Sequence, residues 1–313
     1  MTRILIIKLG ALGDVVMATP LIGLIQSRHA DGRCALLTSD EFAPLFANWS
    51  GLEVASFPRR GFDPMLRAIS WIRRGRFARI YDLQSSDRSG LLCALSGAPI
   101  RVGNHPRFPY THHPASRWRG QSHIFARMIE VLKAAGIDAP PGPPSLPATE
   151  ADRAAARTWL ESRGLQRAPW IVLHAGASPA HPEKCWPGFA QLCTALRERG
   201  IATVAAGAAR DAAINRELAA AGAIDATGNF TLPQLVEIGR YARAAVTNDS
   251  GPMHVLSCAG IPVYGLFGPT DWRRTHAVEQ ADRVIAAGPF PTPLAQLSAE
   301  TVLRRLKADG LID

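Results

Sequence analysis

The sequence lacks several patterns that would assign the chain to a class at first sight. Its five cysteines are scattered and none forms a CxxC pair, which favours free thiols in a reducing cytoplasm over a disulfide framework. No uninterrupted apolar run is long enough to cross a bilayer, so any membrane contact is expected to be peripheral. Zinc-finger spacings, RNP-like segments and recognition-helix patterns are missing, which argues against nucleic acid as a partner.

Two common nucleotide-binding signatures are missing as well. The chain has neither the GxxxxGK(S/T) of a P-loop nor the GxGxxG of a dinucleotide site. The run CALLTS ends in a serine, and no acid stands at its end in the position that the ribose of a dinucleotide would need. These absences disfavour a nicotinamide oxidoreductase. No set of carboxylates marks an Mg²⁺ cage, and no metal or other cofactor is expected.

What is present indicates a basic, two-domain protein. The 313 residues are 47% hydrophobic, which is enough for two domains of ordinary size. The net charge of +9 suits a phosphorylated ligand or an anionic membrane. The apolar start resembles a signal peptide, but Lys8 and Asp14 interrupt it. We therefore interpret it as a buried strand and helix.

Short apolar strands alternate with helices through both halves of the chain, a pattern typical of α/β folds with parallel sheets. The proline-rich run APPGPPSLP, residues 139–147, is the best linker. The sequence therefore predicts Rossmann-like domains at 1–147 and 148–313 that face a central cleft, where such sheets bind ligands. The closing helix, SAETVLRRLKADG, is free to pack back on the N-terminal domain.

The run KLGALGD, residues 8–14, follows the first predicted strand and opens a helix. Its spacing alone favours Asp14 as a helix cap. The alternative is a general base, because a carboxylate after a central strand lies where ligands bind.

Two further segments place polar residues where helices begin. In HAGASPAHPEKCWPGF, Lys184 precedes a helix and could meet a diphosphate, although most lysines are simply solvated. In TNDSGPMHVLSCAGIPVYGLFGPT, Asp249 and Ser250 stand at a helix start, which attracts anions. Capping of that helix is the alternative for both residues.

Four segments together resemble glycosyltransferase family 9, the ADP-heptose:lipopolysaccharide heptosyltransferases. They are GALGDVVMATPLI, YDLQSSDRSG, LHAG…KCWP and NDSGPMHVLSCAGIPVYGLFGPT, and their order and spacing extend over nearly the whole chain. The resemblance implies a GT-B fold with an N-terminal acceptor domain and a C-terminal nucleotide-sugar domain. It implies inverting, metal-independent transfer of heptose from ADP-heptose to the lipopolysaccharide inner core. The enzyme would be cytoplasmic and peripherally associated with the inner membrane.

The resemblance also implies roles for individual residues. Asp14 matches the catalytic base, Lys184 the lysine that meets the donor diphosphate, and Asp249 the acid that holds the heptose hydroxyls. The other expected donor-binding residues are Gly13, His174, Asp211, Ser250, Gly251 and His254. The sequence departs from the family at Ala209 and Arg210, where a glutamate often contacts the ribose. Asp211 is a possible substitute, and the nucleotide stays open for that reason.

An anionic, lipid-linked saccharide is the expected acceptor, because arginine binds phosphate and carboxylate oxygens in a bidentate manner. The candidate acceptor-binding residues are Arg59, Arg60, Arg88, Arg107 and Arg119. A solvated basic face is the alternative for each. Three other functions remain open: a GT-B protein that binds nucleotide sugars without turnover, a transferase with another donor, and one with a protein acceptor.

Overall fold

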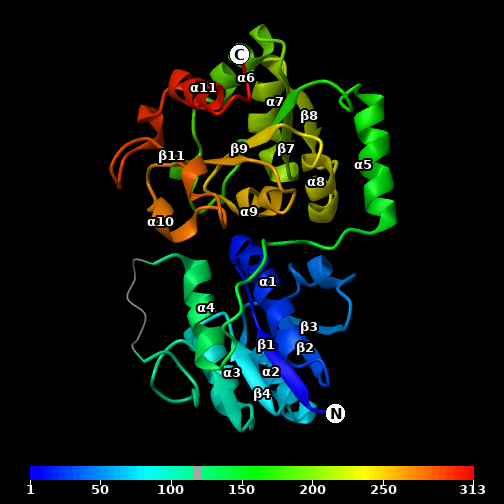
Figure 1. The fold of residues 1–313 in the computed structure, drawn as a ribbon, viewed down its shortest axis with the longest axis vertical. Coiled ribbons are helices and arrows are strands. Elements are labelled where there is room, and N and C mark those ends of the chain that lie inside the picture. Colours follow the sequence, from blue (N-terminus) through cyan, green and yellow to red (C-terminus); the bar gives the residue numbers. More distant parts are fainter. Residues whose placement is uncertain (116–121) are drawn as a thin grey trace. The chain divides into compact units, whose positions relative to one another are not determined.

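The computed structural model describes residues 1–115 and 122–313. The chain forms two compact units, Met1–Pro147 and Ala148–Asp313. The boundary falls at the end of the proline-rich segment 139–147, which has no regular secondary structure. Each unit is a parallel sheet with helices packed against it (Figure 1).

The N-terminal unit contains a five-stranded sheet in the order β3-β2-β1-β4-β5, and every adjacent pair is parallel. The strands are β1 (Arg3–Ile7), β2 (Arg33–Ser39), β3 (Leu52–Phe57), β4 (Arg79–Asp82) and β5 (Ile100–Val102). The run ILII in β1 is buried because β2 and β4 flank the strand and helices cover both faces of the sheet.

Among its described residues, this unit has four helices and one 3₁₀ turn: α1 (Leu12–Arg28), η1 (Ala43–Phe46), α2 (Phe62–Gly75), α3 (Asp87–Leu95) and α4 (Ile124–Ala134). α1 contacts α4, whereas α2 contacts α3. Met65 and Ile72 of α2 share a buried cluster with Leu92 of α3 and with Leu5 and Ile7 of β1, so α2 and α3 cover the same face of the sheet.

The C-terminal unit contains a six-stranded parallel sheet in the order β11-β10-β9-β6-β7-β8. The strands are β6 (Trp170–His174), β7 (Ala202–Gly207), β8 (Ile224–Thr227), β9 (Ala244–Asn248), β10 (Val263–Phe267) and β11 (Ile285–Ala286). The alternation of the sequence indicates only four of them. β8 and β11 are edge strands of four and two residues, too short for an apolar run.

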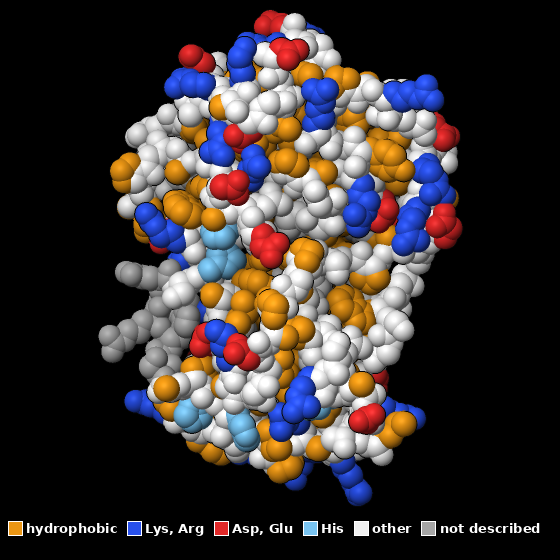
Figure 2. Space-filling view, viewed as in Figure 1, with side chains coloured by type: hydrophobic (Ala, Val, Ile, Leu, Met, Phe, Trp, Pro, Cys, Tyr) orange, Lys and Arg blue, Asp and Glu red, His pale blue; other side chains and the backbone are white. Residues whose placement is uncertain are grey.

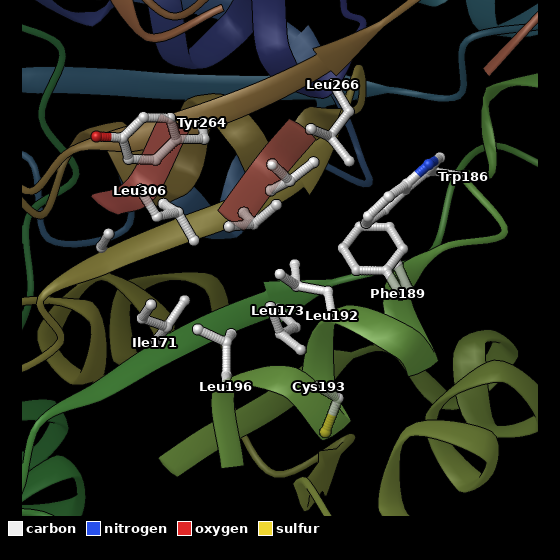
Figure 3. Packing of buried hydrophobic residues seen from close by; sticks show 14 of the residues in the cluster. Ile171, Leu173, Trp186, Phe189, Leu192, Cys193, Leu196, Tyr264, Leu266 and Leu306 are labelled. Carbon is white, nitrogen blue, oxygen red and sulfur yellow. The ribbon is translucent and has the colours of Figure 1, made fainter. Parts of the chain in front are cut away.

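The helices of this unit are α5 (Glu150–Ser162), α6 (Phe189–Glu198), α7 (Ala212–Ala220), α8 (Leu232–Gly239), α9 (Gly251–Ser257), α10 (Trp272–Thr275) and α11 (Ala299–Ala308). Four 3₁₀ turns are η2 (Pro182–Lys184), η3 (Ala209–Asp211), η4 (Ala281–Arg283) and η5 (Leu294–Gln296). Trp186 packs edge-on against Phe189 in the core (Figure 3).

The closing helix α11 packs against the C-terminal unit, to which it belongs. Val302 and Leu306 are fully buried in the core of the C-terminal unit, and α11 contacts α6. The apolar stripe of α11 is therefore used within its own unit.

Each sheet has a point at which the order of its strands reverses. In the N-terminal unit the connections after β1 and β4 lead to opposite sides, and in the C-terminal unit those after β6 and β9 do the same. Ligands of open α/β sheets bind outside the carboxyl ends of strands at such points. Asp14, Asp82, Lys184 and Asp249 lie between the last residue of one of these four strands and the first turn of the helix that follows it.

Candidate active site

Asp14 lies in the first turn of α1, close to the carboxyl end of β1. The cap residue of α1 is Ala11, which makes no side-chain cap bond, and Asp14 is the third residue of the helix. The expectation that Asp14 caps α1 is therefore wrong. Its side chain is 27% exposed, so the carboxylate is accessible from outside the protein. Gly13 is buried in the same turn.

Lys8 is a buried neighbour of Asp14 that the sequence did not single out as a functional residue. Its side chain is 2% exposed, and Nζ donates to the carbonyl of Leu83 over 3.2 Å. Nζ also lies 3.6 Å from Oδ2 of Asp14. Burial lowers the pKa of Lys8, while the negative charges of Asp14 and Asp82 act to raise it.

The loops after β1 and β4 are joined by side chains that the sequence patterns also missed. Oε1 of Gln84 accepts from the backbone N–H groups of Leu9 (2.9 Å) and Gly10 (3.1 Å). Asp82 is fully buried and accepts from the Tyr110 hydroxyl at 2.5 Å, and burial raises the pKa of Asp82. The two Gln84 bonds hold the turn that leads to Asp14.

The predicted acceptor-binding arginines are only partly brought together. Arg59 and Arg88 line a small pocket with Thr38 and Ser39, beyond the ends of β1, β2 and β3. Arg59 also lies against the β1–α1 turn. If Gly10 carried a Cβ atom, that atom would be 3.2 Å from Nη1 of Arg59.

The other candidates for acceptor binding lie elsewhere. Arg60 and Arg107 are exposed and do not line the pocket of Arg59 and Arg88. Arg119 lies outside the described residues. On the face drawn in Figure 2, basic side chains are interspersed with acidic ones and do not gather in one patch.

In the C-terminal unit, Lys184 and Asp249 form an ion pair. Lys184 Nζ is 2.7 Å from Oδ2 of Asp249, and the side chains are 19% and 8% exposed. The hydroxyls of Thr270 (2.8 Å) and Thr275 (3.2 Å) also donate to the Asp249 carboxylate. Asp249 is therefore held by three side chains and does not cap α9.

Ser250 is the cap residue of α9, but its side chain makes no cap bond. Within the described part of the chain, its buried Oγ has no hydrogen-bond partner. The capping role expected for Ser250 is therefore not observed. Gly251 begins α9, and His254 is buried one turn later.

Asn248, the last residue of β9, connects the two central loops of this unit. Its Nδ2 donates to the carbonyl of Ala175 over 2.7 Å, and its Oδ1 accepts from the backbone N–H of Trp186 over 3.1 Å. The side chain thus fixes the segment that follows Lys184. In the sequence, this role of Asn248 is indicated only by its position directly before Asp249 in the run TND.

His174 and Asp211 form a second buried pair beside this site. Nε2 of His174 is 3.9 Å from Oδ2 of Asp211, and that oxygen accepts from the N–H of Ala208 over 2.8 Å. Burial lowers the pKa of His174, although Asp211 opposes the shift. Asp211 is only 6% exposed, whereas Ala209 and Arg210 are exposed after β7.

The described residues contain no cluster of three or more metal-ligating side chains of His, Cys, Asp or Glu. Among the described helices, none combines the length and apolar character needed to cross a membrane.

Known proteins share both the fold and the sequence pattern. A glycosyltransferase family 9 structure from Veillonella parvula superposes with a TM-score of 0.84 at 22% identity, covering 98% of this chain and 96% of that one. The ADP-heptose lipopolysaccharide heptosyltransferase II of Escherichia coli gives a TM-score of 0.77 at 23% identity, covering 98% of both chains. These similarities define the fold as GT-B.

The sequence comparisons identify the family. The model of glycosyltransferase family 9 (heptosyltransferase) matches residues 65–300. Lipopolysaccharide heptosyltransferase 2 of Escherichia coli K12 is 25% identical, with 98% of both chains covered. The chain belongs to glycosyltransferase family 9, the heptosyltransferase family, and is a glycosyltransferase.

Proposed function

We propose that the enzyme transfers heptose from ADP-heptose to an anionic, lipid-linked saccharide of the lipopolysaccharide inner core. The transfer inverts the anomeric carbon and needs no metal. The observation that carries this proposal is the Asp14 carboxylate, which is accessible and free of any capping role at the reversal point of its sheet. The names of the similar proteins, lipopolysaccharide heptosyltransferase 2 and ADP-heptose lipopolysaccharide heptosyltransferase II, support the donor and the acceptor.

The base supplies the first half of the chemistry. An acceptor hydroxyl attacks the anomeric carbon while its proton passes to Asp14. The bond between that carbon and the β-phosphate oxygen breaks, and its electron pair leaves with ADP. Attack and departure on opposite faces of the sugar give inversion.

Lys184 and Asp249 supply the donor contacts. Lys184 neutralises charge that grows on the leaving diphosphate, assisted by backbone N–H groups at Ser250 and Gly251. Asp249 accepts from heptose hydroxyls, while Thr270 and Thr275 keep its carboxylate in place. The ion pair of 2.7 Å holds Lys184 ready before the diphosphate arrives.

Arg59 and Arg88 form the acceptor contacts, since both line one pocket of the unit that carries Asp14. Their guanidinium groups suit a carboxylate or phosphate on the acceptor saccharide. A lipid-linked acceptor and a net charge of +9 favour a cytoplasmic enzyme attached peripherally to an anionic membrane.

A second donor is favoured by one observation. Ala209 and Arg210 are exposed where the family often has a ribose-binding glutamate, and Asp211 is buried beside His174. The nucleotide pocket therefore differs from the family pattern, and UDP-sugars are the alternative donors.

A donor panel tests the proposal. ADP-heptose, other ADP-sugars and UDP-sugars are each incubated with the enzyme and a deacylated inner-core acceptor, with and without EDTA. We expect transfer from ADP-heptose alone, unchanged by EDTA, with an inverted anomeric centre by NMR. Faster transfer from a UDP-sugar would replace the donor. Activity that EDTA abolishes and added metal restores would contradict the metal-free mechanism.

A further inference from the structure

Lys8 is a buried charged group that the proposed mechanism does not use. It follows β1 directly, and its side chain is 2% exposed. Lysines are rarely buried unless they are paired. We therefore expect the buried Lys8 side chain to act on its neighbour Asp14.

Two contacts fix the ammonium group of Lys8 at the carboxyl ends of β1 and β4. Nζ donates to the carbonyl of Leu83, which follows β4, and lies 3.6 Å from the Asp14 carboxylate on α1. Asp82 of β4 and Arg127 of α4 are the other charges that face it. The ammonium thus lies on the inner side of Asp14, whose carboxylate keeps its 27% exposure.

We propose that Lys8 is a positioning residue, whose Nζ holds the Asp14 carboxylate in the orientation that meets the acceptor hydroxyl. The proposal rests on the role of Asp14 as the base. A carboxylate on a helix surface samples several rotamers, and a fixed cation 3.6 Å away favours one of them.

Two variants that remove the charge test the proposal. Lys8→Met keeps most of the apolar stem, and Lys8→Gln also keeps a donor for the Leu83 carbonyl. We expect kcat to fall by ~10–100-fold in both, because misplacement of a reacting group by about 1 Å has this effect. The affinity for ADP should not change, since Lys184, Ser250 and Gly251, which contact the diphosphate in the proposed mechanism, belong to the other unit.

The split between kcat and KM separates this role from a structural one. Loss of the positioning contact should lower kcat and leave the KM for the donor at the parental value. Tyr110→Phe is the matched control, because it removes the hydroxyl that bonds Asp82 without touching Asp14. This control should lose stability but keep the kcat and the KM of the parent.

The outcomes distinguish this inference from the proposed function. Full activity of Asp14→Asn would refute the base itself. An inactive Asp14→Asn together with a parental kcat in both Lys8 variants would overturn the positioning role alone. So would failure of both Lys8 variants to fold, or a kcat that falls equally in Tyr110→Phe.

Discussion

The ion pair between Lys184 and Asp249 allows a stability and a binding effect to be predicted from one change, Asp249→Asn. At 2.7 Å and an effective dielectric of 20, the direct attraction is about 6 kcal/mol. Much of it offsets desolvation, and loss of one partner of a buried pair usually costs 3–5 kcal/mol. Because the Lys184 side chain is 19% exposed and can reach solvent, we expect a loss of about 3 kcal/mol.

Urea unfolding of the C-terminal unit, followed by tryptophan fluorescence, measures this loss. The double variant Lys184→Met, Asp249→Asn is the control, because it leaves no unpaired charge. It should be more stable than Asp249→Asn alone. With the Lys184→Met variant completing the cycle, the coupling energy between the two side chains should be about 1–3 kcal/mol. Parental stability of Asp249→Asn would show that the pair contributes nothing to the stability.

The same variant tests how the two residues divide donor binding. Asp249→Asn should weaken binding of ADP-heptose far more than binding of ADP, since the carboxylate is assigned to the sugar. Calorimetric titration with each ligand measures the two affinities. Equal losses for both ligands would refute the assignment.

Two further predictions follow from the charges of the chain. The enzyme should bind anionic vesicles through Arg59 and its neighbours. Salt at 1 M should release the enzyme from the vesicles, because the Debye length falls to ~3 Å. Equal pelleting with neutral and anionic vesicles would contradict this prediction. Since burial lowers the pKa of His174, its contribution to stability is fully present above the unfolded value of 6.5 and lost as the pH falls toward the folded value. His174→Gln should therefore flatten the acid side of the stability curve in urea titrations, and parallel curves would refute the link.

The sequence predicts the architecture better than it predicts its edges. Apolar, β-branched runs such as RILII and WIVLH can only be stable where both faces are covered, which gives two parallel sheets. β11 has two residues and β8 only one fully buried residue, so neither leaves a periodic signal. The run DEFAPLFAN indicates a helix, but only the 3₁₀ turn η1 forms.

The site shows where local patterns stop being informative. Asp14 and Asp249 both follow strands and precede helices, so capping was the simplest interpretation, yet neither caps its helix. The partner of Asp249 is Lys184, which is 65 residues away in the sequence and is brought near only by adjacent strands. Lys8 was interpreted as a charge that breaks an apolar run, because its partners Asp14 and Leu83 come from two other elements.

The rate of heptose transfer by Asp14→Asn tests the central claim most directly. The amide keeps the size of the side chain and loses the base, so turnover should fall by ~10²–10⁴-fold. Calorimetry should show that ADP binds to the variant as it does to the parent, and thermal unfolding should show an intact fold. Transfer at the parental rate by a folded Asp14→Asn variant would contradict the account.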